Sequence, residues 1–349
     1  MELSTTINVT ELFTAASYGT TVNPRYYSYL PVPLPGFALY AFISLCFLGF
    51  VIGSIGNVLV IVAIAQTRKL RTTANAFLAS LAVADVATCV IVLPILATAL
   101  ISLETIITSH VLCRLFYHTT LTFSPVSIQH LILIAANRYT LINKNPRIYV
   151  KIFNKRTISV FIACIWVINV LLNFGVAVTS YGARRFFGKD YCFLEQKNAI
   201  GTLYWLITLL YTFLSCFVII PLFYILTFRT VHKSHVRVKQ DHSMTDAPSI
   251  ATVSVHPSTL QTAGGQRQPR RLLSSSEIKL TKVNFFIFIT NVFFLSPLFF
   301  VLAINGGEIT HGVFVLILFP IGMNSVTNPL VYCGFNRNFR QAFKAILKL

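Results

Sequence analysis

The chain has 349 residues, of which 55% are apolar and only 11% are charged, and its formal net charge is +18. Soluble domains carry about 25% charged residues, so this composition excludes a soluble enzyme, a disordered protein and a disulfide-rich secreted module. It predicts a polytopic membrane protein. In that class a basic excess reflects Lys and Arg in cytoplasmic loops, so we expect no nucleic-acid partner.

Seven apolar stretches are long enough to cross a bilayer as helices. A hydrocarbon core about 30 Å thick requires roughly 20 apolar helical residues, and uninterrupted runs favour helices over the alternating strands of a membrane barrel. We therefore expect an all-α fold, a seven-transmembrane helix bundle over residues 37–334 that follows an N-terminal segment, residues 1–36. The predicted spans are residues 37–65, 72–103, 115–136, 157–183, 198–228, 283–307 and 312–336.

The distribution of charge predicts the orientation of the bundle. An odd number of spans leaves the termini on opposite sides, and most of the 28 Lys and Arg residues fall in loops on the side of the C-terminus. The positive-inside bias makes that side cytoplasmic and the N-terminus extracellular. The sequon Asn8-Val9-Thr10 agrees, because glycosylation takes place on the lumenal side. We expect a multi-pass plasma-membrane protein that is glycosylated at Asn8.

Two cytoplasmic segments differ from the spans. Residues 231–277 are rich in Ser, Thr, Gln and Gly, which predicts a flexible third cytoplasmic loop. Residues 335–349 are too short to span. Apolar residues recur there every four positions with basic residues between them, which predicts an amphipathic helix lying on anionic membrane lipids. The apolar positions are Phe335, Phe339, Phe343 and Leu347.

Asp85 is the only formally charged residue within a predicted span. An ionisable group in the membrane is costly and marks a functional site by default. The alternative is a neutral carboxyl group that hydrogen-bonds to its neighbours. No nucleophile–base pair, metal set or phosphate-binding loop occurs in the sequence, so we do not expect an enzyme.

Short motifs stand at fixed places along the spans. They are Gly56-Asn57-Val58-Leu59-Val60 in the first, Leu81-Ala82-Val83-Ala84-Asp85 in the second, Asn137-Arg138-Tyr139 at the end of the third, Trp166 in the fourth, Pro221 in the fifth, Pro297 in the sixth and Asn328-Pro329-Leu330-Val331-Tyr332 in the seventh. In this order, from residue 37 to about 347, they resemble the motifs of rhodopsin-like (class A) G-protein-coupled receptors. Within that class, Asn137-Arg138-Tyr139 and Leu70-Arg71-Thr72 resemble the melatonin-type, medium-chain-fatty-acid-type and invertebrate Tre1-Moody orphan group.

The resemblance implies a sodium ion as an allosteric ligand of the inactive state, with no other cofactor. Carboxylate, hydroxyl and amide oxygens suit a hard monovalent cation. A water-filled hydrogen-bond network is the alternative. The implied ligands are Asp85, Ser127, Asn324, Ser325 and Asn328.

The resemblance also implies a switch that faces a heterotrimeric G protein, for which the inhibitory type is favoured. Arg138 and Glu277 would form the inactive-state lock, and its release would free Arg138. Because Asn137 replaces the usual aspartate, protonation at that position cannot contribute to activation. The further switch residues implied are Tyr139, Pro297, Asn328, Pro329 and Tyr332.

Two positions argue against two known classes of ligand, cationic amines and retinal. Thr120 stands where amine receptors carry an aspartate, and Gly322 stands where opsins carry the retinal lysine. A mostly apolar helix surface with hydroxyl groups fits a small, largely apolar extracellular ligand. Arg184 and Arg185 either pair with a carboxylate of the ligand or are solvated loop residues. The expected pocket residues of the third span are Phe116, Tyr117, Thr120, Leu121 and Ser124.

Three positions in the fifth and sixth spans differ from the family pattern. Leu295 replaces the usual tryptophan of the sixth span, Asn291 replaces a phenylalanine, and Arg229 replaces a tyrosine of the fifth span. The resemblance implies a disulfide between Cys113 and Cys192, and we expect the other five cysteines to be small buried apolar residues. Two other functions stay open: a receptor fold without G-protein coupling, in a decoy or guidance role, and a small-solute transporter.

Overall fold

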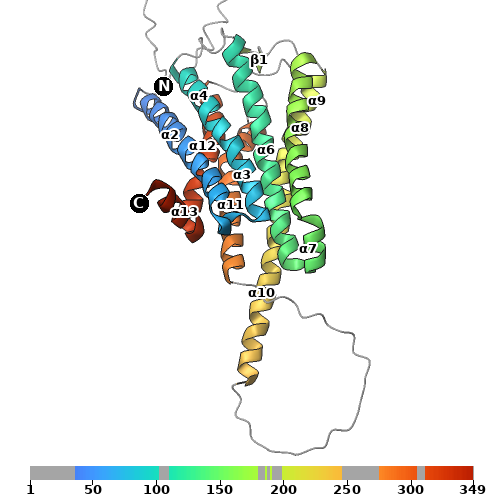
Figure 1. Cartoon of the computed structure of the whole chain (residues 1–349). Coiled ribbons are helices and arrows are strands. Elements are labelled where there is room, and N and C mark those ends of the chain that lie inside the picture. The colour runs from blue at the N-terminus through green and yellow to red at the C-terminus, as the bar shows by residue number, and fades with distance from the viewer. Residues whose placement is uncertain are drawn as a thin grey trace, which may run out of the picture.

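The computed structural model describes residues 36–101, 110–179, 185–186, 189–190, 199–245, 275–304 and 311–348. Within them, long helices stand side by side and cross the bundle seven times (Figure 1). This arrangement confirms the predicted all-α fold. The crossings are α2 (Gly36–Gln66); α3 (Thr73–Ala87) continued by the π-helical turn η3 (Thr88–Val92) and α4 (Leu93–Ile101); α6 (His110–Asn143); α8 (Lys155–Thr179); α9 (Ala199–Leu214) continued by the π-helical turn η4 (Ser215–Ile219) and α10 (Ile220–Thr245); α11 (Ser275–Ile304); and α12 (His311–Phe335).

The long helices coincide with the predicted apolar spans. A bilayer offers no water to the backbone, so a spanning segment must satisfy its own N–H and C=O groups, as a helix does. Six of the described segments are long and apolar enough to cross a membrane. The seventh predicted span lies in α12, whose side chains are described only from Phe319 onward. Large apolar side chains such as Val167 and Leu171 of α8 are exposed, as a lipid-facing surface requires.

Short elements join the crossings or follow them. A two-residue hairpin pairs β1 with β2 in antiparallel register, with Arg185 opposite Asp190. The helix α7 begins with a proline, and Asn145 caps it by accepting a hydrogen bond from the Arg147 amide at 2.9 Å. These elements are the 3₁₀ turn η2 (Arg68–Leu70), α7 (Pro146–Ile152), β1 (Arg185–Phe186), β2 (Lys189–Asp190) and α13 (Arg337–Leu347).

The flexible loop predicted at about residues 231–277 begins too early. Helix α10 continues to Thr245 and extends out of the bundle (Figure 1), and α11 begins at Ser275. Residues 222–245 contain neither proline nor glycine, and their Lys, Arg and Gln residues favour helix. Residues 246–274 lie outside the described part of the chain.

Helix α13 confirms the predicted amphipathic helix, but it begins at Arg337 and half of its apolar face packs inward. Asn336 caps it by accepting a hydrogen bond from the Asn338 amide at 3.0 Å. Phe339 and Phe343 are buried, and the Phe339 ring stacks on Tyr332 with centroids 5.0 Å apart. Phe335 and Leu347 are exposed, so the two ends of the predicted apolar face are available to lipid.

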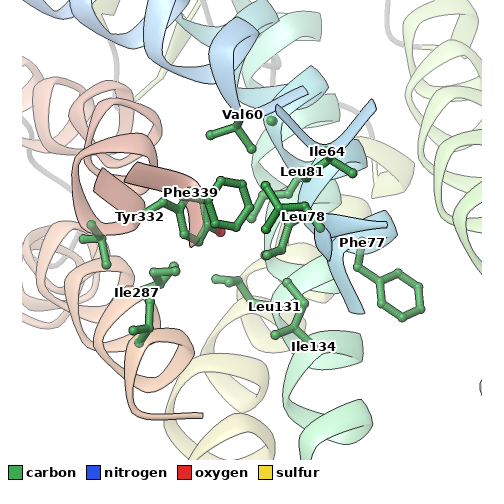
Figure 2. Packing of buried hydrophobic residues seen from close by; sticks show 14 of the residues in the cluster. Val60, Ile64, Phe77, Leu78, Leu81, Leu131, Ile134, Ile287, Tyr332 and Phe339 are labelled. Carbon is green, nitrogen blue, oxygen red and sulfur yellow. The ribbon is translucent and has the colours of Figure 1, made fainter. Parts of the chain in front are cut away.

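The largest apolar cluster fills the half of the bundle next to α7 and α13 (Figure 2). It takes side chains from all seven crossings and from α13, so it closes that end of the bundle. Among its members are Val60, Ile64, Phe77, Leu78, Leu81, Leu131, Ile134, Ile287, Tyr332 and Phe339.

Helix α2 approaches α12 closely because glycines face it. A Cβ atom on Gly56 would lie 2.7 Å from Cγ of Pro329, and one on Gly49 would lie 3.1 Å from the sulfur of Met323. Small residues allow transmembrane helices to pack backbone against backbone. The motif of the first predicted span, which contains Gly56, therefore packs against the motif of the seventh, which contains Pro329.

This contact predicts a stability effect. Gly56→Ala should lower the free energy of unfolding by about 1–3 kcal/mol, because the added methyl group overlaps the rigid Pro329 ring. Thermal unfolding of the purified protein in detergent measures the loss. Gly334→Ala is the matched control, since a Cβ atom there meets nothing within 4 Å. Equal melting temperatures for the two variants would contradict the close approach.

Candidate functional site

A buried carboxylate joins α3 to α12. The side chain of Asp85 is fully buried, and Nδ2 of Asn328 donates a hydrogen bond to its Oδ2 at 2.6 Å. The π-helical turn η3 begins three residues after Asp85, and such turns are frequent at functional sites. The other carboxylate oxygen, Oδ1, has no hydrogen-bond partner. The carboxylate is thus held from one side and keeps acceptor capacity on the other.

Neutral oxygens surround this carboxylate. The hydroxyl groups of Ser127 and Ser325 interact with Asp85 from α6 and α12. Asn324 is buried one position before Ser325, and its Oδ1 has no partner, as is also true of Oδ1 of Asn328. One carboxylate with several neutral oxygens suits a monovalent cation. Over the described ranges, no group of three His, Cys, Asp or Glu residues is placed to hold a metal ion.

Asn57 ties α2 to the same region. Its Nδ2 donates to the carbonyl of Gly53 and, across the bundle, to the carbonyl of Ser325, each at 2.9 Å. The second bond reaches the backbone of the residue whose hydroxyl interacts with Asp85. The motifs of the first, second and seventh predicted spans therefore meet at one point.

A second buried ionisable side chain, that of Arg138, lies near the C-terminal end of α6. Arg138 is only 3% exposed, and it interacts electrostatically with Tyr149 of α7, Tyr224 of α10 and Glu277 of α11. Its Nε has no hydrogen bond. Glu277 stands in the first turn of α11, which places it at the same end of the bundle. The guanidinium is therefore enclosed by three elements rather than exposed at the surface.

Asn137 has a tyrosine partner that the sequence did not reveal. Its Nδ2 donates to the hydroxyl of Tyr149 at 3.3 Å, and that hydroxyl lies 3.0 Å from Oγ1 of Thr73. One phenol thus connects α6, α7 and α3. No periodic signal marked Tyr149, because α7 is short and has no buried residue.

Arg229 replaces a tyrosine of the family pattern, and the structure shows a different tyrosine, Tyr224, near Arg138. Arg229 is exposed, whereas Tyr224 is buried and interacts electrostatically with both Arg138 and Tyr332. The Tyr224 ring stacks with Phe288 of α11, with centroids 5.8 Å apart. The sequence carried a signal for this residue, because the buried positions of α10 follow helical spacing. They are Ile220, Tyr224, Thr227 and Val231.

The remaining switch residues lie in helices that pack at this end of the bundle. The Tyr139 ring lies 5.6 Å from that of Phe223, and Tyr332 stacks on Phe339. Pro297 lies within α11, two positions after Leu295. Leu295, which stands where the family has tryptophan, packs with Ile128 of α6 and Cys216 of η4.

The expected ligand pocket is described only in part. Phe116 is buried, Leu121 and Ser124 are half-buried, and Thr120 is half-buried with a hydroxyl that has no hydrogen-bond partner. The side chain of Tyr117 lies outside the described residues. The same holds for Arg184, for the side chain of Arg185, for Asn8, and for the disulfide between Cys113 and Cys192.

The expectation for the other cysteines is only partly right. Cys46, Cys89 and Cys216 are buried, but Cys164 and Cys333 are exposed. Both exposed thiols stand on transmembrane helices, where a small apolar side chain can face lipid without cost.

Asp85 and Arg138 both lie in a segment of the chain that matches a known protein family. Residues 56–332 match the profile of the 7 transmembrane receptor (rhodopsin family). The chain belongs to this family. Its members are membrane receptors rather than enzymes, which agrees with the absence of a catalytic motif in the sequence.

Similar proteins of the family are distant. The octopamine receptor beta-1R of Drosophila melanogaster is 28% identical over 328 residues, which cover 88% of this chain and 62% of that receptor. The histamine H2 receptor of Cavia porcellus is 26% identical over 290 residues, covering 82% of this chain and 74% of the receptor. The 5-hydroxytryptamine receptor 2C of Pan troglodytes is 28% identical over 329 residues, covering 84% and 69%. The chain spans less than two thirds of the octopamine receptor's length.

These relatives bear on the finer resemblance. All three are named for amines, whereas the motifs at Asn137-Arg138-Tyr139 and Leu70-Arg71-Thr72 suggested the melatonin-type, fatty-acid-type and Tre1-Moody group. The relatives thus support the class and give that subgroup no support.

The shared phenol of Tyr149 yields a prediction. Tyr149→Phe should lower the free energy of unfolding by about 1 kcal/mol, because it leaves Asn137 and Thr73 without their partner. Thermal unfolding is the measurement. Thr73→Val should cost a similar amount, and the double variant should lose less than the sum, since both changes break one contact. Fully additive losses would show that the two side chains do not share the hydroxyl.

Proposed function

We propose that this rhodopsin-family protein is a plasma-membrane receptor that binds an extracellular ligand and activates a heterotrimeric G protein. The observation that carries the proposal is the burial of Arg138 and its electrostatic interaction with Glu277 and Tyr224, at the end of the bundle that the charge distribution predicts to be cytoplasmic. Glu277 is half-buried, so solvent screens its electrostatic interaction with Arg138, which contributes roughly 0–1 kcal/mol. Such a lock is therefore weak enough for a ligand to release, and a change of a few kcal/mol is sufficient to shift the population.

Loss of coupling in Arg138→Ala tests the proposal. In cells, dissociation of G-protein subunits should be detected with the wild type and lost in this variant, because the cation that faces the G protein is removed. The panel covers inhibitory, stimulatory and phospholipase-coupled types, and the inhibitory type is tested first. Pools of lipids, indoles and peptides serve as ligands.

Glu277→Ala is the matched variant in the same assay. It should raise basal signalling, because it removes a carboxylate that interacts with Arg138 in the closed bundle. No rise would count against the lock. Silence of the wild type in every pool, with surface expression confirmed, would favour a receptor fold without coupling in a decoy or guidance role; solute flux would favour a transporter.

The amine receptors among its relatives raise the question of whether this chain also binds an amine. We propose that it does not. The position that carries aspartate in amine receptors is Thr120, whose hydroxyl is buried and has no partner. A neutral hydroxyl beside Phe116 and Leu121 favours a small, largely apolar ligand with a polar group that bonds to Thr120.

This ligand class predicts silence toward amines. Octopamine, histamine and serotonin should fail to stimulate the wild type at concentrations that activate the three relatives, because no carboxylate at residue 120 pairs with an ammonium group. Subunit dissociation is the measurement, with one of the relatives as the positive control. An amine response that Thr120→Ala abolishes would contradict the proposal.

We propose further that Asp85, Ser127, Asn324, Ser325 and Asn328 bind sodium in the closed state. The support is the free acceptor capacity of Asp85 and of the two asparagine oxygens. Sodium would supply a positive charge to the carboxylate, and the neutral oxygens would complete its coordination.

Sodium should therefore stabilise the purified protein. At about ten times its dissociation constant the gain is roughly 1.4 kcal/mol, so the melting temperature should be higher in sodium chloride than in choline chloride of equal ionic strength. Asp85→Ala should remove this difference. Ser80→Ala should retain it, since Ser80 bonds to Trp166 rather than to this site. A wild type indifferent to the salt would exclude the ion and leave the water-filled network.

A further inference from the structure

The helix α6 contains a proline near its middle that does not belong to the motifs described above. The motif prolines are Pro221, Pro297 and Pro329, whereas Pro125 lies inside α6. A proline inside a helix has no backbone N–H group, so the carbonyl group four residues earlier loses its hydrogen bond. In α6 that carbonyl belongs to Leu121. The helix therefore lacks one backbone hydrogen bond halfway along its length.

A side chain of α8 takes the place of the missing donor. Nδ2 of Asn173 donates to the carbonyl of Leu121 at 3.2 Å, and it also donates to the carbonyl of Asn169 in its own helix at 2.8 Å. Asn173 is only 4% exposed. A membrane helix tolerates an internal proline when a neighbouring side chain satisfies the freed backbone group. Asn173 thus supplies to α6 the donor that Pro125 lacks.

Helix α9 orients the amide of Asn173. The helices α6, α8 and α9 pack against one another (Figure 1), and the hydroxyl of Tyr204 in α9 donates to Oδ1 of Asn173 at 3.1 Å. The nitrogen of the amide then donates to two carbonyls, and its oxygen accepts from the tyrosine. A half-turn of the amide would bring its oxygen against those carbonyls, which cannot donate. Tyr204 therefore holds Asn173 in the orientation that reaches Leu121.

A second asparagine of α8 repeats this arrangement on the other side of the proline. Asn169 stands one turn earlier on α8, and its Nδ2 donates to Oε1 of Gln129 at 3.0 Å. Gln129 follows Pro125 by four residues, as Leu121 precedes it by four, and Gln129 also interacts with Tyr211 of α9. In the described part of the chain, no buried side-chain nitrogen or oxygen of Gln129 or of the two asparagines lacks a hydrogen-bond partner. Helix α8 thus holds α6 one turn before and one turn after the proline.

Pro125 separates two parts of α6 that have different expected roles. The expected ligand wall, residues 116–124, precedes it. Ser127, which interacts with the buried carboxylate of α3, and Arg138 follow it. Helices bend at proline because the backbone hydrogen bond that resists bending is missing there. With the carbonyl of Leu121 unbonded, the first part of α6 could move without the second.

We propose that Asn173, oriented by Tyr204, is a positioning residue that makes the two parts of α6 move as one. A ligand bound at residues 116–124 then displaces the rest of the helix with them. The connection between the ligand side and the cytoplasmic end of α6 depends on side chains of α8 and α9, because Pro125 removes the backbone bond that would otherwise provide it. The signalling role of this bridge rests on the proposed receptor function, whereas the bridge itself does not.

Hydrogen exchange of the purified full-length protein, without any ligand, tests the bridge. Asn173→Ala should speed the exchange of backbone amides in residues 111–124 about fivefold or more, because a buried carbonyl loses its donor and the segment opens more often. Residues 127–138 are the internal control and should stay within about twofold of the wild type. Ser159→Ala is the matched variant on α8 and should change neither segment, since the Ser159 hydroxyl donates to the carbonyl of Lys155 in its own helix at 3.0 Å.

Rescue by Pro125→Ala distinguishes the bridge from a general packing role of Asn173. Alanine at this position restores the backbone N–H that bonds to Leu121, so the double variant Pro125→Ala, Asn173→Ala should exchange within about twofold of the wild type. Tyr204→Phe should speed exchange less than Asn173→Ala does, and Pro125→Ala should cancel this effect too.

Three results would overturn the bridge. The first is an unchanged exchange rate in a folded Asn173→Ala. The second is an equal acceleration with proline and with alanine at residue 125, because Asn173 would then contribute packing alone. If Asn173→Ala does not fold, the double variant decides: the bridge requires it to fold and to exchange like the wild type, and a double variant that also fails to fold is the third contrary result.

The cell assay of subunit dissociation then tests the signalling role. With an active ligand pool and equal surface expression, Asn173→Ala should lower the maximal response about fivefold, and the double variant with Pro125→Ala should recover it. A full response from Asn173→Ala whose exchange is accelerated would overturn the signalling role. A wild type that is silent in every pool would remove that role together with the proposed function, and the exchange result would then stand by itself.

Discussion

The carboxylate of Asp85 sets the arrangement of the bundle. A buried charge is tolerated only when polar groups reach it, because transfer of an unpaired charge out of water costs far more than a single packing contact contributes. Asn328 meets this requirement with a 2.6 Å hydrogen bond, and the hydroxyls of Ser127 and Ser325 add to it. These partners fix the rotation of α3, α6 and α12 about their own axes. Asn57 then fixes α2 through the carbonyl of Ser325.

The contacts around Arg138, near the C-terminal end of α6, differ from those around Asp85. Arg138 interacts electrostatically with side chains of α7, α10 and α11, and two of these partners, Tyr149 and Glu277, are only half-buried, so solvent weakens their interactions. A closed end that depends on many weak contacts can open at low cost, and this is a physical requirement for a receptor. The aromatic packing of Tyr224 against Phe288 and of Tyr332 on Phe339 adds apolar contacts that α11 and α13 share with the bundle.

Prediction from the sequence was most accurate where the membrane imposes the structure. Within the described residues, each of the seven predicted spans overlaps a helix of the bundle, because a long apolar run in a bilayer has no alternative to helix. The motif residues Asp85 and Asn328, far apart in sequence, do meet. Prediction failed where nothing in the pattern is periodic or apolar: Tyr149 lies on a short helix without buried residues, and residues 231–245 are helical although they are polar. Tyr224 was overlooked although the spacing of its buried neighbours marked it.

The sequence alone therefore determined the class of fold, the places of the membrane crossings along the chain and Asp85 as the ionisable residue within a crossing. These properties follow from local composition and from the length that a bilayer demands. Only the tertiary structure decided which buried polar side chains lie next to one another. Asn137 bonds to Tyr149, Tyr224 rather than Arg229 lies beside Arg138, and Asn284 is buried without a partner. Such pairings depend on how far each helix is rotated and how closely it approaches its neighbours, and no single segment of the chain encodes either quantity.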